Sequence, residues 1–200
     1  MNKKIGVLVS GRGSNLQALI DRLPGLPLEI SVVISDVPTA FALERARRAG
    51  IPALVIEAGG KSRQEFELAL AGALCQYEVD FTVLAGFMRL MGPQFLAQAP
   101  GPVINIHPAL LPAFPGMHAQ AQALAYGVKV SGCTVHFVDE GMDTGPIIAQ
   151  RAVPVLDSDD ADSLAERILE QEHILLPEVV GLVAAGRVVL ENKKVRIKGE

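Results

Sequence analysis

The chain has 200 residues, half of them hydrophobic, which is enough to bury one substantial core and predicts a single domain. Acidic residues outnumber basic ones 22 to 18, and no run of Lys or Arg exceeds two, which argues against a nucleic-acid-binding surface. The two cysteines match neither a metal-ligand spacing nor a disulfide framework, so we expect Cys75 and Cys133 to be core thiols of a cytoplasmic protein. The N-terminal apolar run is too short for a signal peptide, and we expect no membrane span.

Five short apolar runs in the first half of the chain predict the strands of a parallel sheet. Near-continuous Val, Ile and Leu runs are typical of strands covered on both faces, and longer helix-period segments alternate with them. We therefore predict an α/β fold with a doubly wound, mostly parallel sheet flanked by helices. The predicted strands are 4–10, 28–35, 52–57, 80–86 and 102–106, and the predicted helical segments include 15–23, 39–50 and 62–78.

The pattern changes after about residue 108. Segments 132–139 and 145–155 predict two further strands that pair like a hairpin. A long amphipathic helix is expected after the Asp-rich segment 157–163, whose Ser and Asp residues suit an N-cap and a first helical turn. The tail, 186–200, predicts a short edge hairpin with an exposed basic end.

The segment SGRGSNLQAL, residues 10–19, directly follows the first predicted strand and reads as a phosphate cradle. Its glycines permit a tight turn, and Ser14 and Asn15 can cap the helix whose free N–H groups bind an anion. A dinucleotide fingerprint would need a third glycine where this chain has Leu16, although Asp36 stands where a ribose-binding acid could lie. A glycine-bearing turn without a ligand is the alternative.

Segments 84–91 and 105–108 change character at the carboxyl ends of their strands, where open α/β sheets bind ligands. Asn105 offers an amide donor suited to a developing oxyanion, and His107 offers an imidazole that titrates near neutrality. Strand alternation puts both side chains on one face, with Ile106 on the other. A packed, hydrogen-bonded structural histidine is the alternative.

The segment HFVDEGMDTGPII, residues 136–148, holds three acids within five residues: Asp139, Glu140 and Asp143. A carboxylate on this loop could orient and charge-stabilise His107, as the acid of a catalytic triad does for its imidazole. A solvated turn is the alternative for each acid. No Ser or Cys occupies a strained nucleophile elbow, so covalent acyl transfer is not indicated.

Four motifs follow one another along the chain: GRGSN, LAGFMRLM, NIHPALLPAFPGMHA and HFVDEGMDTGPIIAQ. In this order and spacing they resemble the phosphoribosylglycinamide formyltransferase family, the folate-dependent one-carbon transferases of purine biosynthesis, over essentially the whole chain. The resemblance implies transfer of the formyl group of 10-formyltetrahydrofolate to the amine of glycinamide ribonucleotide, through a tetrahedral intermediate. It implies these two small-molecule partners, no metal, and a cytoplasmic monomer or homodimer.

The resemblance also implies one Rossmann-like formyltransferase domain over residues 1–200. Its phosphate-binding half would span about 1–100, and its folate and catalytic half about 101–200. His136 and the loop 109–120 would support the site, and the loop 113–122 could act as a lid. The implied residue roles are ribonucleotide binding by Gly13, Ser14, Asn15 and Glu172, folate binding by Arg63, Met88, Arg89, Leu90, Met91 and Asn105, and catalysis by Asn105, His107 and Asp143.

Three alternatives remain beside this interpretation. A hydrolase that deformylates the same folate needs a similar Asn, His and Asp trio, but the GRGSN segment argues against it. A formyltransferase acting on initiator tRNA would need an added nucleic-acid-binding region and more positive charge. A nicotinamide-binding oxidoreductase would leave the NIHP segment and the acidic loop unexplained.

Overall fold

The computed structural model describes residues 2–199 and divides into two compact units, which meet in the sequence between Asn105 and Ile106. Each unit is described by itself.

Five parallel strands of the seven-stranded sheet form the centre of the first unit, in the order β3-β2-β1-β4-β5. Each of the five expected strands is present, although the third is shorter than predicted. Its outer position in this sheet gives it one paired neighbour, and pairing stops after three residues. The strands are β1 (Lys3–Val9), β2 (Leu28–Ser35), β3 (Ala53–Val55), β4 (Phe81–Leu84) and β5 (Val103–His107), whose last two residues belong to the second unit.

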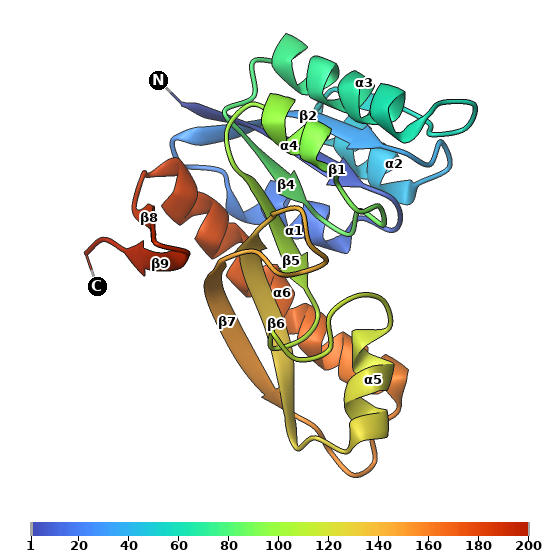
Figure 1. The fold of residues 1–200 in the computed structure, drawn as a ribbon, viewed down its shortest axis with the longest axis vertical. Helices are drawn as coiled ribbons and strands as arrows, with labels where there is room; N and C mark the ends of the chain where they lie inside the picture. The colour runs from blue at the N-terminus through green and yellow to red at the C-terminus, as the bar shows by residue number, and fades with distance from the viewer. Residues whose placement is uncertain (1, 200) are drawn as a thin grey trace. The chain divides into compact units, whose positions relative to one another are not determined.

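Helices cover both faces of this sheet (Figure 1). The helices α1 (Ser14–Arg22) and α2 (Phe41–Arg48) pack together, and α3 (Arg63–Gln76) packs with the short α4 (Pro93–Gln98). The middle of β1 is accordingly buried on both sides, since successive side chains of a strand point to opposite faces. The α/β, doubly wound fold predicted from the apolar runs is confirmed.

The strand order reverses between β1 and β4, because the chain moves outward from β1 to β3 and then returns to the other side of β1. In open α/β sheets such a switch point opens a crevice beyond the carboxyl ends of the two strands. The segments that leave β1 and β4 at these ends are residues 10–13 and 85–92.

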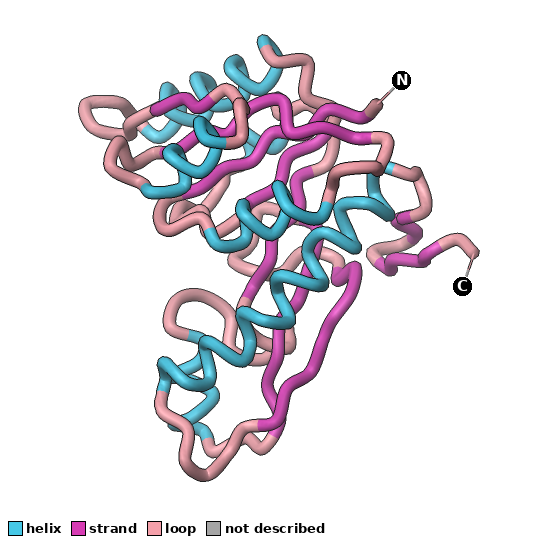
Figure 2. The backbone as a smooth tube through the Cα atoms, turned by 180° about the vertical axis from the view of Figure 1, so that it is seen from behind, coloured by secondary structure: helices cyan, strands magenta, loops and turns pink. Residues whose placement is uncertain are grey.

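The second unit is built on the antiparallel strands β6 (Val130–Phe137) and β7 (Ile147–Pro154), as predicted. The long helix α6 (Ala161–Ala184) packs along both strands (Figure 2). It begins where expected, because the Asp160 side chain accepts a hydrogen bond from the Ser163 backbone N–H and caps the helix. A further helix, α5 (Ala119–Tyr126), occupies the second part of the loop expected at 113–122.

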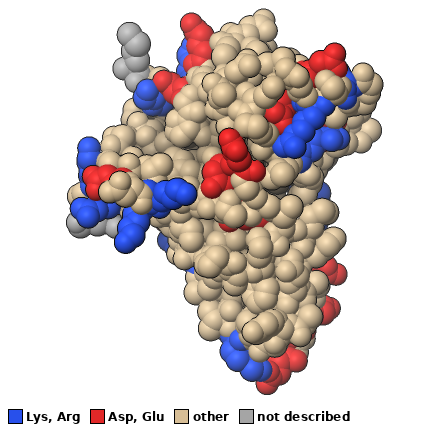
Figure 3. Space-filling view, in the orientation of Figure 1, with Lys and Arg blue, Asp and Glu red and all other residues tan. Residues whose placement is uncertain are grey.

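The C-terminal hairpin consists of β8 (Val188–Glu191) and β9 (Lys194–Ile197), with Lys and Arg side chains gathered on it (Figure 3). The predicted hairpin is confirmed, and it forms a two-stranded sheet of its own, with β9 in contact with β7. Asn192 and Lys193 both have positive φ, which matches the twist of a two-residue hairpin and lets the two strands pair with each other. Within residues 2–199, none of the helices is long and apolar enough to cross a membrane.

One of the two cysteine predictions is wrong. Cys133 is buried in β6, whereas Cys75 is exposed because it falls on the outer side of the last turn of α3.

Candidate functional site

His107 and Asp143 lie side by side in the second unit. His107 Nδ1 is 3.3 Å from Asp143 Oδ2, and His107 Nε2 is 2.8 Å from the carbonyl oxygen of Phe114. A carbonyl oxygen only accepts, so Nε2 carries a proton, and Nδ1 then faces a carboxylate oxygen. The two ring nitrogens of this buried histidine therefore each face an oxygen atom, and a ring with a proton on both nitrogens could donate to both.

Asp143 is fixed by the backbone as well as by histidines. The Gly116 N–H donates to Asp143 Oδ2 at 2.8 Å, and the other carboxylate oxygen lies 3.7 Å from His136 Nε2. Asp143 itself has a φ of 55°, in the left-handed region that aspartate and asparagine tolerate better than most residues. The carboxylate is thus aimed at His107 by a turn that few other residue types adopt easily.

His136 closes the other side of the carboxylate and is buried in β6. Its Nδ1 lies 2.8 Å from the Phe137 carbonyl oxygen, which assigns the proton to Nδ1. Burial lowers the pKa of His136, and the Phe137 hydrogen bond and the Asp143 charge oppose that shift. Burial therefore favours the neutral form of His136. Among the described residues, no group of three or more His, Cys, Asp or Glu side chains is arranged to hold a metal ion.

The structure distinguishes the three acids of the 138–146 loop. Asp139 Oδ1 accepts from the Gly141 N–H and from the Thr144 hydroxyl, so this acid stabilises its own loop. Glu140 is exposed. Asp143 is the one of the three that faces His107.

The segment after His107 is held by two residues that sequence reasoning missed, Thr134 and Gln150. The buried Thr134 hydroxyl donates to the Ala109 carbonyl and accepts from the Leu111 N–H, and Gln150 Nε2 donates to both Thr134 and the Leu111 carbonyl. These partners lie 16 to 39 positions apart in the chain, so no local pattern could have revealed them. This network fixes residues 109–111, at the start of the segment in which the Phe114 carbonyl contacts His107.

In the first unit, the GRGSN segment forms the turn into α1. Gly13 is the N-cap residue, with a φ of 72°, and a Cβ on it would stand 2.6 Å from the Ala42 Cβ of α2. The expected N-cap position of Ser14 or Asn15 is wrong, since Gly13 takes that position and Ser14 is already the first helical residue. The glycine instead allows α1 and α2 to approach closely, and it has no side chain with which to cap α1.

Asp36 lies at the end of β2, where the nicotinamide alternative expected a ribose-binding acid. It accepts a hydrogen bond from Ser10 Oγ at 2.7 Å and pairs with Arg89 Nε at 2.6 Å. Both carboxylate oxygens thus have protein partners, so Asp36 is a structural acid. The nicotinamide alternative, which already lacked the third glycine, therefore loses its ribose-binding acid as well.

The predicted folate-binding residues of the first unit come together. Arg63, the first residue of α3, donates from Nη2 to the Leu90 carbonyl at 3.2 Å. Met88 and Leu90 are exposed, whereas Met91 is buried and anchors the end of the segment. The segment therefore exposes Met88, Arg89 and Leu90 to solvent.

The two remaining predicted site residues, Asn105 and Glu172, are half-buried and buried, respectively. Asn105 is half-buried on β5, opposite Leu84 of β4 in the parallel register. Glu172 is buried on α6. The pKa of the Cys133 thiol is raised to about 12, first by burial and second by the charge of Glu172, so this thiol is unreactive.

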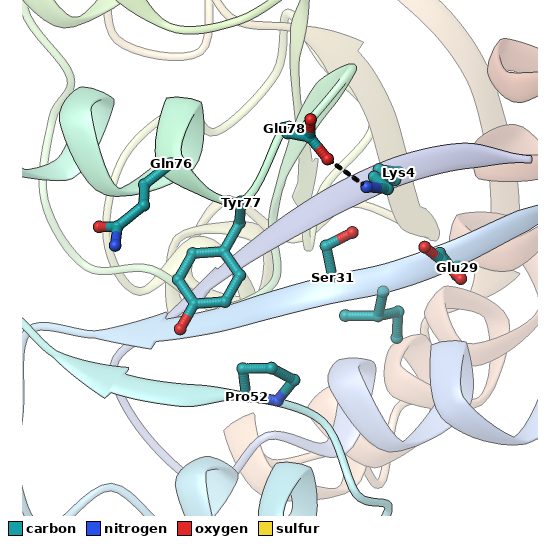
Figure 4. Close-up of a pocket in the computed structure, with 8 residues that line it drawn as sticks. Lys4, Glu29, Ser31, Pro52, Gln76, Tyr77 and Glu78 are labelled. Carbon is teal, nitrogen blue, oxygen red and sulfur yellow. Dashed lines mark hydrogen bonds and ion pairs between the residues drawn. The ribbon is translucent and has the colours of Figure 1, made fainter.

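A cavity of about 390 Å³ lies toward the amino ends of the first unit's strands, away from the carboxyl ends that carry the segments 10–13 and 85–92 (Figure 4). Lys4, which is ion-paired with Glu78, stands near the start of β1, and Ser31 lies in the first half of β2. Ligands of open α/β sheets bind at the carboxyl ends, so this cavity is not the candidate site.

Comparison with known proteins bears on the whole chain. A family model described as formyl transferase matches residues 3–180. A phosphoribosylglycinamide formyltransferase from Mycobacterium tuberculosis is 46% identical, over 97% of this chain and 94% of that protein. The trifunctional purine biosynthetic protein adenosine-3 of Drosophila pseudoobscura pseudoobscura is 49% identical over 96% of this chain, which spans only 15% of that larger protein.

A solved structure agrees with these relatives. The crystal structure of glycinamide ribonucleotide transformylase 1 from Symbiobacterium toebii superposes with a TM-score of 0.95 at 53% identity. The match covers 98% of this chain and 94% of that one. The similarity thus extends over both units and both groups of candidate residues.

Proposed function

We propose that this chain, which belongs to the formyl transferase family, moves the formyl group of 10-formyltetrahydrofolate to the amine of glycinamide ribonucleotide. The products would be formylglycinamide ribonucleotide and tetrahydrofolate. The observation that carries the proposal is the buried His107, with acceptors at both ring nitrogens, beside the carboxylate of Asp143. A phosphoribosylglycinamide formyltransferase at 46% identity and nearly equal length supports the choice of substrate.

In this proposal the reaction is a direct attack on the formyl carbon. The amine of the ribonucleotide adds to that carbon, and negative charge develops on the formyl oxygen of the tetrahedral intermediate. Asn105 donates a hydrogen bond from its amide to this oxygen, and protonated His107 stabilises the oxygen with a positive charge. Asn105 precedes His107 by two residues on β5, so strand alternation turns both side chains to the same face.

Asp143 keeps His107 in the charged form and helps the proton move from the attacking amine to the folate nitrogen. An acceptor of fixed orientation is suited to this role, and the Gly116 N–H fixes the Asp143 carboxylate. Collapse of the intermediate breaks the bond between carbon and folate nitrogen, and that nitrogen takes the proton. Every step uses side chains of this chain, and we propose that no metal takes part.

The binding roles follow the two units. The start of α1, with Gly13, Ser14 and Asn15, would bind the ribonucleotide phosphate, since the N–H groups and the dipole at a helix N-terminus attract an anion. Glu172 would contact the same substrate through its carboxylate. Folate binding is assigned to Arg63 and to the segment from Met88 to Met91, together with Asn105. One formyltransferase domain comprising both units, a cytoplasmic location and a monomeric or homodimeric state remain predictions.

The experiment is a spectrophotometric assay of formyl loss. Purified protein is mixed with a stable formyl-folate analogue, with and without glycinamide ribonucleotide. Formyl loss that requires the ribonucleotide would establish the transferase. Formyl loss without it would indicate a hydrolase, and no formyl loss in either mixture would refute the proposed function.

A further inference from the structure

We propose that two buried acids, Asp36 and Glu67, are positioning residues that hold the segment 88–92 in the shape that receives the formyl folate. The inference rests on the proposed function, because folate binding by this segment is part of it. Neither acid has been given a role in the reaction, and neither was singled out as a folate-binding residue by the sequence.

Glu67 holds the end of the segment. It lies on α3 with its side chain 3% exposed, and its Oε1 accepts from the Gly92 N–H at 2.9 Å. Its Oε2 accepts from the Phe95 N–H at 3.2 Å, in the first turn of α4. One carboxylate of α3 therefore holds both the end of the segment and the first turn of α4. The helices α3 and α4 lie next to each other in Figure 1.

Glu67 also orients the arginine assigned to folate. Arg63 Nε donates to Glu67 Oε1 at 2.7 Å, which directs the Arg63 Nη2 to the Leu90 carbonyl. A Cβ on Gly92 would lie 2.6 Å from Glu67 Oε1, so the glycine is what allows the carboxylate to come this close. Arg63 and the segment thus share one buried anchor.

Asp36 holds the beginning of the segment. Its carboxylate pairs with Arg89 and accepts from Ser10 Oγ, and the same hydroxyl accepts from the Met88 N–H at 2.9 Å. The Arg89 guanidinium also lies 5.4 Å above the Phe66 ring, which fixes it from a second side. Because Ser10 directly precedes the GRGSN segment, this anchor adjoins the proposed phosphate cradle.

The two anchors explain how a segment with exposed side chains can keep a fixed shape. Met88 is 70% exposed and Leu90 47%, so little packing holds the side chains of the segment. A segment already fixed in its binding shape loses less conformational entropy when a ligand binds. Loosening an anchor should therefore weaken folate binding without changing the chemistry that follows.

The test compares Glu67→Gln with Glu65→Gln. Both substitutions remove one negative charge from α3. Glu65, however, is exposed, and its carboxylate accepts hydrogen bonds from the Ser62 N–H and hydroxyl rather than from the segment 88–92. A glutamine at 67 keeps one acceptor oxygen, so one of the two N–H groups loses its acceptor. We expect the KM for the formyl folate to rise about tenfold in Glu67→Gln, with kcat within about twofold and the KM for the ribonucleotide unchanged.

The control Glu65→Gln should behave as wild type, and Asp36→Asn should raise the folate KM more than the ribonucleotide KM. If Glu67→Gln does not fold, Asp36→Asn alone decides, because it acts at the other end of the segment. An unchanged folate KM would overturn the inference. So would a fall in kcat accompanied by an equal rise in both KM values. In either case, turnover by the wild-type protein would still support the proposed function. A wild-type protein without turnover would refute the proposed function itself.

Discussion

Replacing Asp143 by asparagine isolates the charge that faces His107. Asparagine has nearly the same shape and also tolerates the positive φ of this position. Its carbonyl oxygen can occupy the place of Oδ2, which accepts from the Gly116 N–H and lies against His107 Nδ1. The geometry should therefore survive while the negative charge is lost.

The size of the effect follows from the distance. Opposite unit charges 3.3 Å apart attract by about 5 kcal/mol at an effective dielectric constant of about 20. The oxygen dipole of asparagine retains part of this attraction, so we expect a loss of about 3–4 kcal/mol in transition-state stabilisation. That corresponds to a fall in kcat of about 10²–10³-fold.

The assay is steady-state formyl transfer by the purified Asp143→Asn variant, beside a thermal melt and separate titrations with each substrate. We expect the melting temperature and both dissociation constants to stay close to those of wild type. A kcat within about threefold of wild type would refute the electrostatic role of Asp143. A lost kcat accompanied by a large fall in melting temperature would show instead that the carboxylate stabilises the fold.

Three further changes test other parts of the structure. Gly13→Ala places a methyl group against Ala42 at positive φ, and urea unfolding should show about 2–4 kcal/mol of destabilisation together with a higher KM for the ribonucleotide. Asn105→Ala should lower kcat by about 10²–10³-fold in formyl transfer and leave both KM values within a few-fold. Burial lowers the pKa of His136, so below its ordinary value of 6.5 the unfolded state binds a proton that the native state does not, and stability falls as pH drops. Urea unfolding of His136→Gln between pH 7.5 and about 5 should show a shallower decline than wild type.

The central sheet could be predicted from the sequence because its strands are buried on both faces. Continuous apolar runs interrupted by helix-period segments have few other solutions, and each of the five runs became a strand. The helix α4 was missed because it has only six residues, too few to display a helical period. The helix α5, AQAQALAY, has a weak apolar stripe and follows His118 in a left-handed conformation, so it looked like part of a loop.

The candidate site was predictable only in part. Residue types and spacing identified His107 and three nearby acids, but they did not distinguish the acid that faces the ring from the one that holds its own loop. That difference depends on the Asp139 bonds to Gly141 and Thr144, which are set by the turn geometry. The anchors at Glu67, Thr134 and Gln150 join residues far apart in the sequence, and side chains of these types occur on most protein surfaces.

The left-handed backbone at position 143 limits what mutation can supply there. In a library of all residues at this position, the turn would accept glycine, asparagine and aspartate with least strain, because a larger Cβ substituent clashes at positive φ. Of these three, only aspartate carries a charge. Glutamate keeps the charge but fits this backbone conformation less well. When another residue type replaces Asp143, a second mutation at this position should therefore recover full activity only if it restores aspartate.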